Sequence, residues 1–223
     1  MEINFFNPWF FYSLLFGVYF SCRIPYLGVA LRVVNTMMHE FSHALVAFLF
    51  SGKIQSVKLF SNTEGEVTIS GGSKVVQFLT ALAGYPLSAL SGVGMMYLLM
   101  NDFADFALWT ITGISAVLLL LFVRNLYGVL WLIGFIGING VFLFFEFQSL
   151  QVLFGLIYSF VILSESVHSV FSLLIISLKN PKSAGDAAVL SKLTFFPVVF
   201  WAIVFVFINL FVMFYALKVL ALI

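Results

Sequence analysis

The chain has 223 residues, of which 63% are hydrophobic and only 9% are charged, and its formal net charge is +1. Soluble domains carry about 25% charged residues, so this composition excludes a water-facing surface and predicts an integral, multi-pass protein in contact with the lipid bilayer. A net charge this small argues against a nucleic-acid partner. Open irregular backbone is not tolerated in lipid, and no series of alternating ten-residue segments appears, so we expect helices rather than a barrel.

Seven apolar runs follow one another along the chain. About 20 residues are needed to cross ~30 Å of hydrocarbon, so most runs qualify as membrane spans and the first is marginal. The sequence therefore predicts an all-α polytopic membrane protein with about seven transmembrane helices, or six if the first run does not cross. No linker is long or polar enough to divide the chain, and we expect a single domain over residues 1–223. The runs cover residues 5–20, 26–50, 75–100, 106–123, 126–146, 150–177 and 195–222.

The most polar stretch, residues 53–72, separates the second and third runs. Apolar residues alternate with polar ones between Ile54 and Leu59 and again between Val67 and Ile69, with turn-forming residues between the two sets. This pattern predicts a short β-hairpin. An edge strand could hold a substrate in an extended form through main-chain hydrogen bonds, and a surface loop that closes this side of the protein is an equally supported interpretation.

The basic residues indicate an orientation. If every run spans, the 51–74 loop, Arg124 and the 178–194 loop fall on one side of the membrane. The positive-inside rule then predicts that the hairpin and the 178–194 loop are cytoplasmic, and we expect the inner membrane of a bacterial cell. The basic residues of this side are Lys53, Lys58, Lys74, Arg124, Lys179, Lys182 and Lys192.

The second run contains the segment His39-Glu40-Phe41-Ser42-His43, which has the pattern HExxH. Two histidines four residues apart lie one turn apart on the same face of a helix, so both imidazoles can bind one zinc ion. Glu40 is then placed to accept a proton from a metal-bound water. Ionisable side chains in hydrocarbon are costly, which favours a functional site and a zinc peptidase embedded in the membrane.

Zinc held by two histidines needs a third protein ligand, with one position left open for water. Asp186 lies between small residues at the start of the last apolar segment, on the hairpin side, and a helix cap is its alternative role. His168 is another candidate, although a hydrogen-bonded position within its helix is favoured. The remaining acidic candidates are Asp102, Asp105, Glu146 and Glu165, of which the first three should lie on the opposite side of the membrane.

Asn125 is a candidate for binding the substrate or the oxyanion of a tetrahedral intermediate. Its alternative role is to cap a helix beside Gly128.

Several segments, in their order along the chain, resemble the site-2 protease class of intramembrane metallopeptidases. Within that class the resemblance is to the bacterial peptidase-like branch without PDZ or CBS domains, and it covers most of residues 28–202. It implies zinc held by His39, His43 and Asp186, with Glu40 as the general base. The order Gly185-Asp186-Ala187 departs from the longer Asp-Gly element of better-studied members. The matching segments are 39–45, 52–54 with the hairpin that follows, 83–86, 124–128 and 185–188.

We therefore expect an intramembrane zinc endopeptidase that hydrolyses peptide bonds in membrane-associated protein segments, so that its partner is a transmembrane segment of a substrate protein. The alternative is a non-proteolytic membrane scaffold that binds a metal or a partner helix. Glu40 favours the peptidase, because a scaffold would have no use for a base beside the two histidines.

Overall fold

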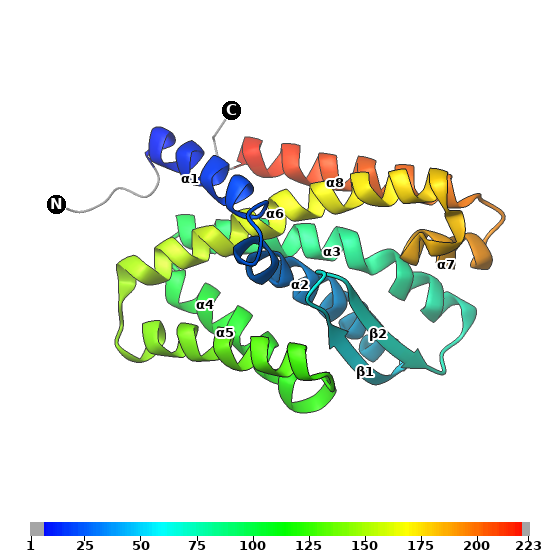
Figure 1. Cartoon of the computed structure of the whole chain (residues 1–223), viewed down its shortest axis with the longest axis horizontal. Coiled ribbons are helices and arrows are strands. Elements are labelled where there is room, and N and C mark those ends of the chain that lie inside the picture. Colours follow the sequence, from blue (N-terminus) through cyan, green and yellow to red (C-terminus); the bar gives the residue numbers. More distant parts are fainter. Residues whose placement is uncertain (1–6, 220–223) are drawn as a thin grey trace.

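A computed structural model describes residues 7–219 of the chain, and Figure 1 shows how its helices and one β-hairpin are arranged. The expected all-α membrane fold, with a hairpin after the HExxH helix, is confirmed. The helices are α1 (Pro8–Ser21), α2 (Leu27–Leu49), α3 (Lys74–Met100), α4 (Ala104–Val117), α5 (Leu126–Phe144), α6 (Gln148–Lys179), α7 (Gly185–Leu193) and α8 (Val198–Val219). The remaining elements are strands β1 (Lys53–Leu59) and β2 (Gly65–Ser70), the π-helical turn η1 (Leu118–Phe122) and the 3-10 turn η2 (Pro181–Ser183).

Five helical segments within residues 7–219 are long and apolar enough to cross a membrane, where the sequence predicts seven. They are α3, α4 with η1, α5, α6 and α8. Helix α1 has only 14 residues, about 21 Å, which is short of the hydrocarbon thickness. Helix α2 has 23 residues, but its polar side chains lower its hydropathy, and most of them are buried inside the protein. Residues 5, 6 and 220–222 of the expected runs lie outside the described residues.

The long helix α6 lies at the centre of the bundle and contacts α1, α2, α3, α4 and α8. The main core is formed where α2, α3 and α6 meet, around Met37, Met96, Leu156 and Phe160. The hairpin, the connection from α4 to α5 and helix α7 lie toward one end of the molecule, and α1 lies toward the other (Figure 1). The three connections that carry most of the basic residues therefore share one end.

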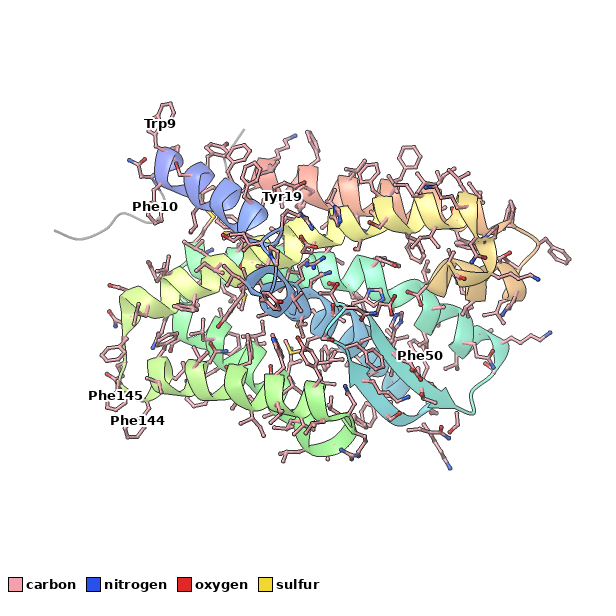
Figure 2. All side chains as sticks on the ribbon, in the orientation of Figure 1. Trp9, Phe10, Tyr19, Phe50, Phe144 and Phe145 are labelled. Atoms are coloured by element: carbon pink, nitrogen blue, oxygen red, sulfur yellow. The ribbon has the colours of Figure 1, made fainter. Side chains whose placement is uncertain are left out.

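The outer surface of the bundle is strongly apolar. Phe207, Phe211 and Phe214 on α8 all point outward, and Trp9 and Phe144 are more than four-fifths exposed near the ends of their helices (Figure 2). A water-soluble monomer does not expose apolar side chains on this scale. This surface suits contact with lipid, and the chain is an integral membrane protein.

The hairpin has one closed edge and one open edge. Strands β1 and β2 are antiparallel, with Leu59 opposite Gly65. On the outer edge of β1, Val57 forms a parallel bridge with Val123, and the Asn125 side chain binds both the N–H and the C=O of Leu59, at 3.2 and 2.5 Å. Within the part of the chain that the structure describes, β2 pairs with no strand other than β1.

Candidate metal centre

Helix α2 carries the HExxH segment in its second half and presents His39 and His43 on one face. The Nε2 atoms of the two histidines are 3.1 Å apart, and their rings are nearly perpendicular. The helix reaches this point without interruption from Leu27, because no glycine or proline follows Gly28 before its end at Leu49. The four-residue spacing thus brings the two imidazoles together as the sequence predicts.

A backbone carbonyl of α3 fixes the orientation of His43. Its Nδ1 atom lies 2.7 Å from the carbonyl oxygen of Thr80. A carbonyl oxygen only accepts hydrogen bonds, so Nδ1 carries the hydrogen and Nε2 of the neutral ring keeps its lone pair. That lone pair points toward His39 and Asp186. A buried backbone acceptor of this kind is a common way to orient a metal-binding histidine.

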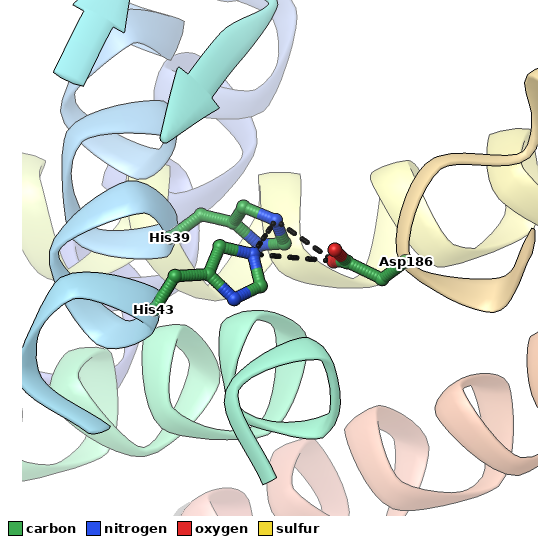
Figure 3. Close-up of side chains that lie close together, drawn as sticks. All are labelled: His39, His43 and Asp186. Atoms are coloured by element: carbon green, nitrogen blue, oxygen red, sulfur yellow. Dashed lines mark hydrogen bonds and ion pairs between the residues drawn. The ribbon is translucent and has the colours of Figure 1, made fainter. Parts of the chain in front are cut away.

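Asp186 reaches the same point from the first turn of α7 (Figure 3). Its Oδ2 atom lies 3.2 Å from Nε2 of His39 and 3.3 Å from Nε2 of His43. The residue that precedes α7 is Ala184, and the Asp186 side chain makes no capping hydrogen bond. The alternative role of Asp186 as a helix cap is therefore not observed, and its carboxylate faces the histidines.

The electrostatic environment keeps Asp186 ionised. Burial alone would raise the pKa of its carboxyl group, but His43 and His39, in their protonated forms, lower the pKa below its usual range through their charge and their hydrogen bonds. A carboxylate is the form that binds a metal ion.

The donor set fits a metal ion. The three atoms lie 3.1 to 3.3 Å apart, and a tetrahedral site with bonds of 2.0–2.1 Å has an edge of roughly 3.3 Å. Among the described residues this is the group of histidine, cysteine and acidic side chains close enough to share an ion. This spacing matches three corners of a tetrahedron, and a zinc ion held here would have a fourth position for water.

Gly84 allows α3 to approach the two histidines. A β-carbon at this position would lie 2.5 Å from Cε1 of His39 and 2.5 Å from both Cε1 and Nε2 of His43. Real β-carbons do not come this close to ring atoms. Helix α3 continues through Pro86, so the glycine serves the close approach of the helix and does not end it.

Glu40 lies under the beginning of β2. A β-carbon on Gly65 would come within 2.3 Å of Oε1 of Glu40 and within 2.6 Å of its Cδ. The hairpin is held over α2 at this point because the hydroxyl of Thr36 donates a hydrogen bond to the Thr63 carbonyl oxygen, at 2.8 Å. Glu40 is buried and directly follows the metal-binding residue His39 on α2.

The sequence was compared with models of protein families, and one of them matches residues 12–216. It describes the peptidase M50B-like proteins. The chain belongs to the peptidase M50B-like family. This family consists of membrane-embedded metallopeptidases. The match agrees with the expected site-2 protease class. No curated protein and no solved structure matches the chain.

In this M50B-like chain Asn125 lies away from Glu40. Asn125 binds Leu59 on the outer edge of β1, and Gly65, which touches Glu40, is the β2 partner of Leu59. The width of both strands thus separates the amide from the carboxylate. Asn125 makes no capping hydrogen bond to α5 either. Its observed contacts hold the hairpin, and its role at a substrate or an oxyanion stays a prediction.

The other acidic candidates are not brought to the metal-binding group of the M50B-like chain. Glu165 forms an ion pair with Arg23 at 2.6 Å. Asp102 and Glu146 lie in the α3–α4 and α5–α6 connections, and Asp105 lies in the first turn of α4, at the end opposite the hairpin.

His168 is exposed on α6. The expected hydrogen bond of its ring is absent within residues 7–219.

Sequence reasoning missed three contacts of the site in this M50B-like chain. The carbonyl of Thr80 carries no side-chain signal, because every residue has a carbonyl. The contact of Gly65 with Glu40 depends on how the hairpin folds back over α2. Tyr85 lies in the 83–86 segment that carries part of the family resemblance, but nothing in the sequence indicates that its ring centroid lies 4.5 Å from that of His39.

Proposed function

We propose that this metallopeptidase is a zinc endopeptidase in which His39, His43 and Asp186 hold the ion. The observation that supports zinc most directly is the set of two imidazole nitrogens and one carboxylate oxygen at tetrahedral spacing. This donor set and geometry suit zinc better than magnesium or calcium, which prefer six or more oxygen ligands. A zinc ion bound here supplies a Lewis acid that acidifies water and polarises a peptide carbonyl.

Glu40 acts as the general base in this proposal. It follows His39 directly on α2, and its carboxylate lies under Gly65 at the start of β2. It takes a proton from the attacking water as the new C–O bond forms, and it gives that proton to the amide nitrogen as the C–N bond breaks. The burial of the site limits access of bulk water to this exchange.

The substrate is proposed to be a membrane-associated protein segment that binds in an extended form along β2. In the antiparallel register, Phe60 donates to the Glu64 carbonyl, so the backbone groups of Gly65 and Val67 point away from β1. The matching groups of Leu59 on the other edge are taken by Asn125. A chain added to β2 would therefore pair with Gly65, which adjoins Glu40.

The orientation and location follow from the basic residues. We propose that the end that carries the hairpin and α7 faces the cytoplasm of a bacterial cell, whose inner membrane holds the protein. The arrangement of the helices supports this because the hairpin, the α4–α5 connection and α7 lie toward the same end.

A cleavage assay tests the proposal. The purified protein in detergent would be incubated with fluorescently labelled casein, a disordered chain that can bind as a strand without first unwinding. We expect cleavage by the wild type, none above background by Glu40→Gln, and wild-type cleavage by Glu146→Gln, which removes a carboxylate at the opposite end. Equal cleavage by the wild type and Glu40→Gln would contradict the proposal. A protein that binds metal but cleaves neither casein nor transmembrane peptides would favour the scaffold alternative.

A further inference from the structure

Tyr85 lies against the metal-binding group but belongs to none of its ligands. It follows Gly84 on α3, the residue that touches both histidine rings. The Tyr85 ring meets that of His39 edge to face, with 4.5 Å between centroids, and it meets Phe205 of α8 at 4.8 Å. Two neighbouring rings thus fix the position of the Tyr85 ring.

The hydroxyl of Tyr85 is free to donate a hydrogen bond. The described residues offer it no hydrogen-bond partner, whereas the buried hydroxyl of Tyr158 donates to Oδ1 of Asn139 at 2.9 Å. The phenol therefore belongs to a residue that contacts a metal-binding histidine, and its own donor is unused.

Tyr85 also lies on the accessible side of the group. The side chains of His39 and Asp186 are 17% and 18% exposed, while that of His43 is 5% exposed. A peptide bond must therefore approach past His39 and Asp186. Tyr85 packs on His39, so its ring borders the side from which a substrate would enter.

We infer that the Tyr85 hydroxyl donates a hydrogen bond to the carbonyl oxygen of the scissile peptide as that oxygen becomes an oxyanion. This inference rests on the proposed peptidase function. The water oxygen bonds to the carbonyl carbon, Glu40 carries the proton to the departing nitrogen, and Tyr85 keeps its own proton throughout. A donor that strengthens its bond as charge develops lowers the barrier without changing the affinity for the substrate.

The test is Tyr85→Phe, which keeps the ring on His39 and removes only the oxygen. We expect kcat on labelled casein to fall by about 10²-fold, with KM and zinc content close to those of the wild type. Tyr97→Phe is the matched control, because Tyr97 lies on the same helix, is 56% exposed and is far from the ligands along α3; it should keep the wild-type kcat.

Two results would overturn the inference. One is a wild-type kcat for Tyr85→Phe in a preparation where Glu40→Gln is inactive. The other is a loss of activity that matches a loss of zinc, because Tyr85 would then only support His39. Failure of the peptidase proposal has a different signature, since Glu40→Gln would then cleave as fast as the wild type.

Discussion

The Oδ2 atom of Asp186 lies 3.2 Å from Nε2 of His39, although α7 and α2 are at opposite ends of the sequence. The two elements meet because α3 and α6 each contact both α2 and α7. Gly84 on α3 also leaves room for both imidazoles. The proposed chemistry depends on these contacts, and each of them can be tested by a small change.

Gly84→Ala should weaken metal binding. Its β-carbon would lie 2.5 Å from atoms of both histidine rings, so the rings or α3 must move. Loss of a contact that orients a metal ligand typically lowers the affinity for the metal 10- to 100-fold. We expect a loss of about this size when zinc affinity is measured by competition with a chelator. Gly94→Ala is the control on the same helix, because a β-carbon there meets no atom within 4 Å. Equal affinity in the two variants would argue against the close approach of α3.

Gly65→Ala should impair cleavage while it leaves the metal in place. The added methyl group would come within 2.6 Å of Cγ and Cδ of Glu40, so the carboxylate must leave its position. The three atoms nearest to the added methyl group all belong to Glu40 and not to a metal-binding residue. We expect kcat to fall by 10-fold or more, roughly the contribution of a positioned base, with one zinc per chain retained. Gly134→Ala, at an open position on α5, should behave as the wild type. Loss of zinc from Gly65→Ala would show that the hairpin supports the ligands themselves.

Asn125→Ala should loosen the hairpin. The Asn125 amide makes two hydrogen bonds to the backbone of Leu59, which is fully buried. Leaving these backbone groups unpaired costs about 1–3 kcal/mol. We expect a lower Tm in detergent and faster amide exchange in β1, with the zinc content unchanged. Unchanged exchange in β1 would mean that the bridge between Val57 and Val123 is sufficient to hold this edge.

Glu165→Met should destabilise the junction between α1 and α2. The change leaves the Arg23 guanidinium without its carboxylate partner, which lies 2.6 Å away. Breaking a buried ion pair costs about 3–5 kcal/mol, and we expect about 2–3 kcal/mol because the Arg23 side chain is 29% exposed. The double variant Arg23→Met with Glu165→Met should recover most of the lost Tm. A double variant as unstable as Glu165→Met alone would show that the loss comes from packing and not from the unpaired charge.

The parts of the site that depend on local geometry were predictable from the sequence. The four-residue spacing of His39 and His43 places both rings on one helix face, and alternation in residues 53–70 predicts both strands of the hairpin. Asp186 could be chosen among several acidic residues only through a resemblance to a family, because nothing local specifies which distant segment meets α2.

Long-range packing accounts for what the sequence did not reveal. Five segments within residues 7–219, and not seven, have the length and hydropathy of a membrane span, because α1 ends after 14 residues and α2 carries a buried polar face. The amide of Asn125 gives no sign that its partner is the backbone of Leu59, 66 residues earlier. The contact between Asn125 and Leu59 forms only when β1 and the segment after η1 meet in the folded protein.

The measurement that tests the central claim most directly is the zinc content of the detergent-purified protein by elemental analysis. It should cover the wild type, His39→Ala, His43→Ala, Asp186→Ala and Glu40→Gln. We predict one zinc per chain in the wild type and in Glu40→Gln, and its loss from each of the three alanine variants, because two remaining ligands hold the ion poorly. A folded wild-type protein without stoichiometric metal, or an Asp186→Ala variant that keeps its zinc, would contradict the proposed centre.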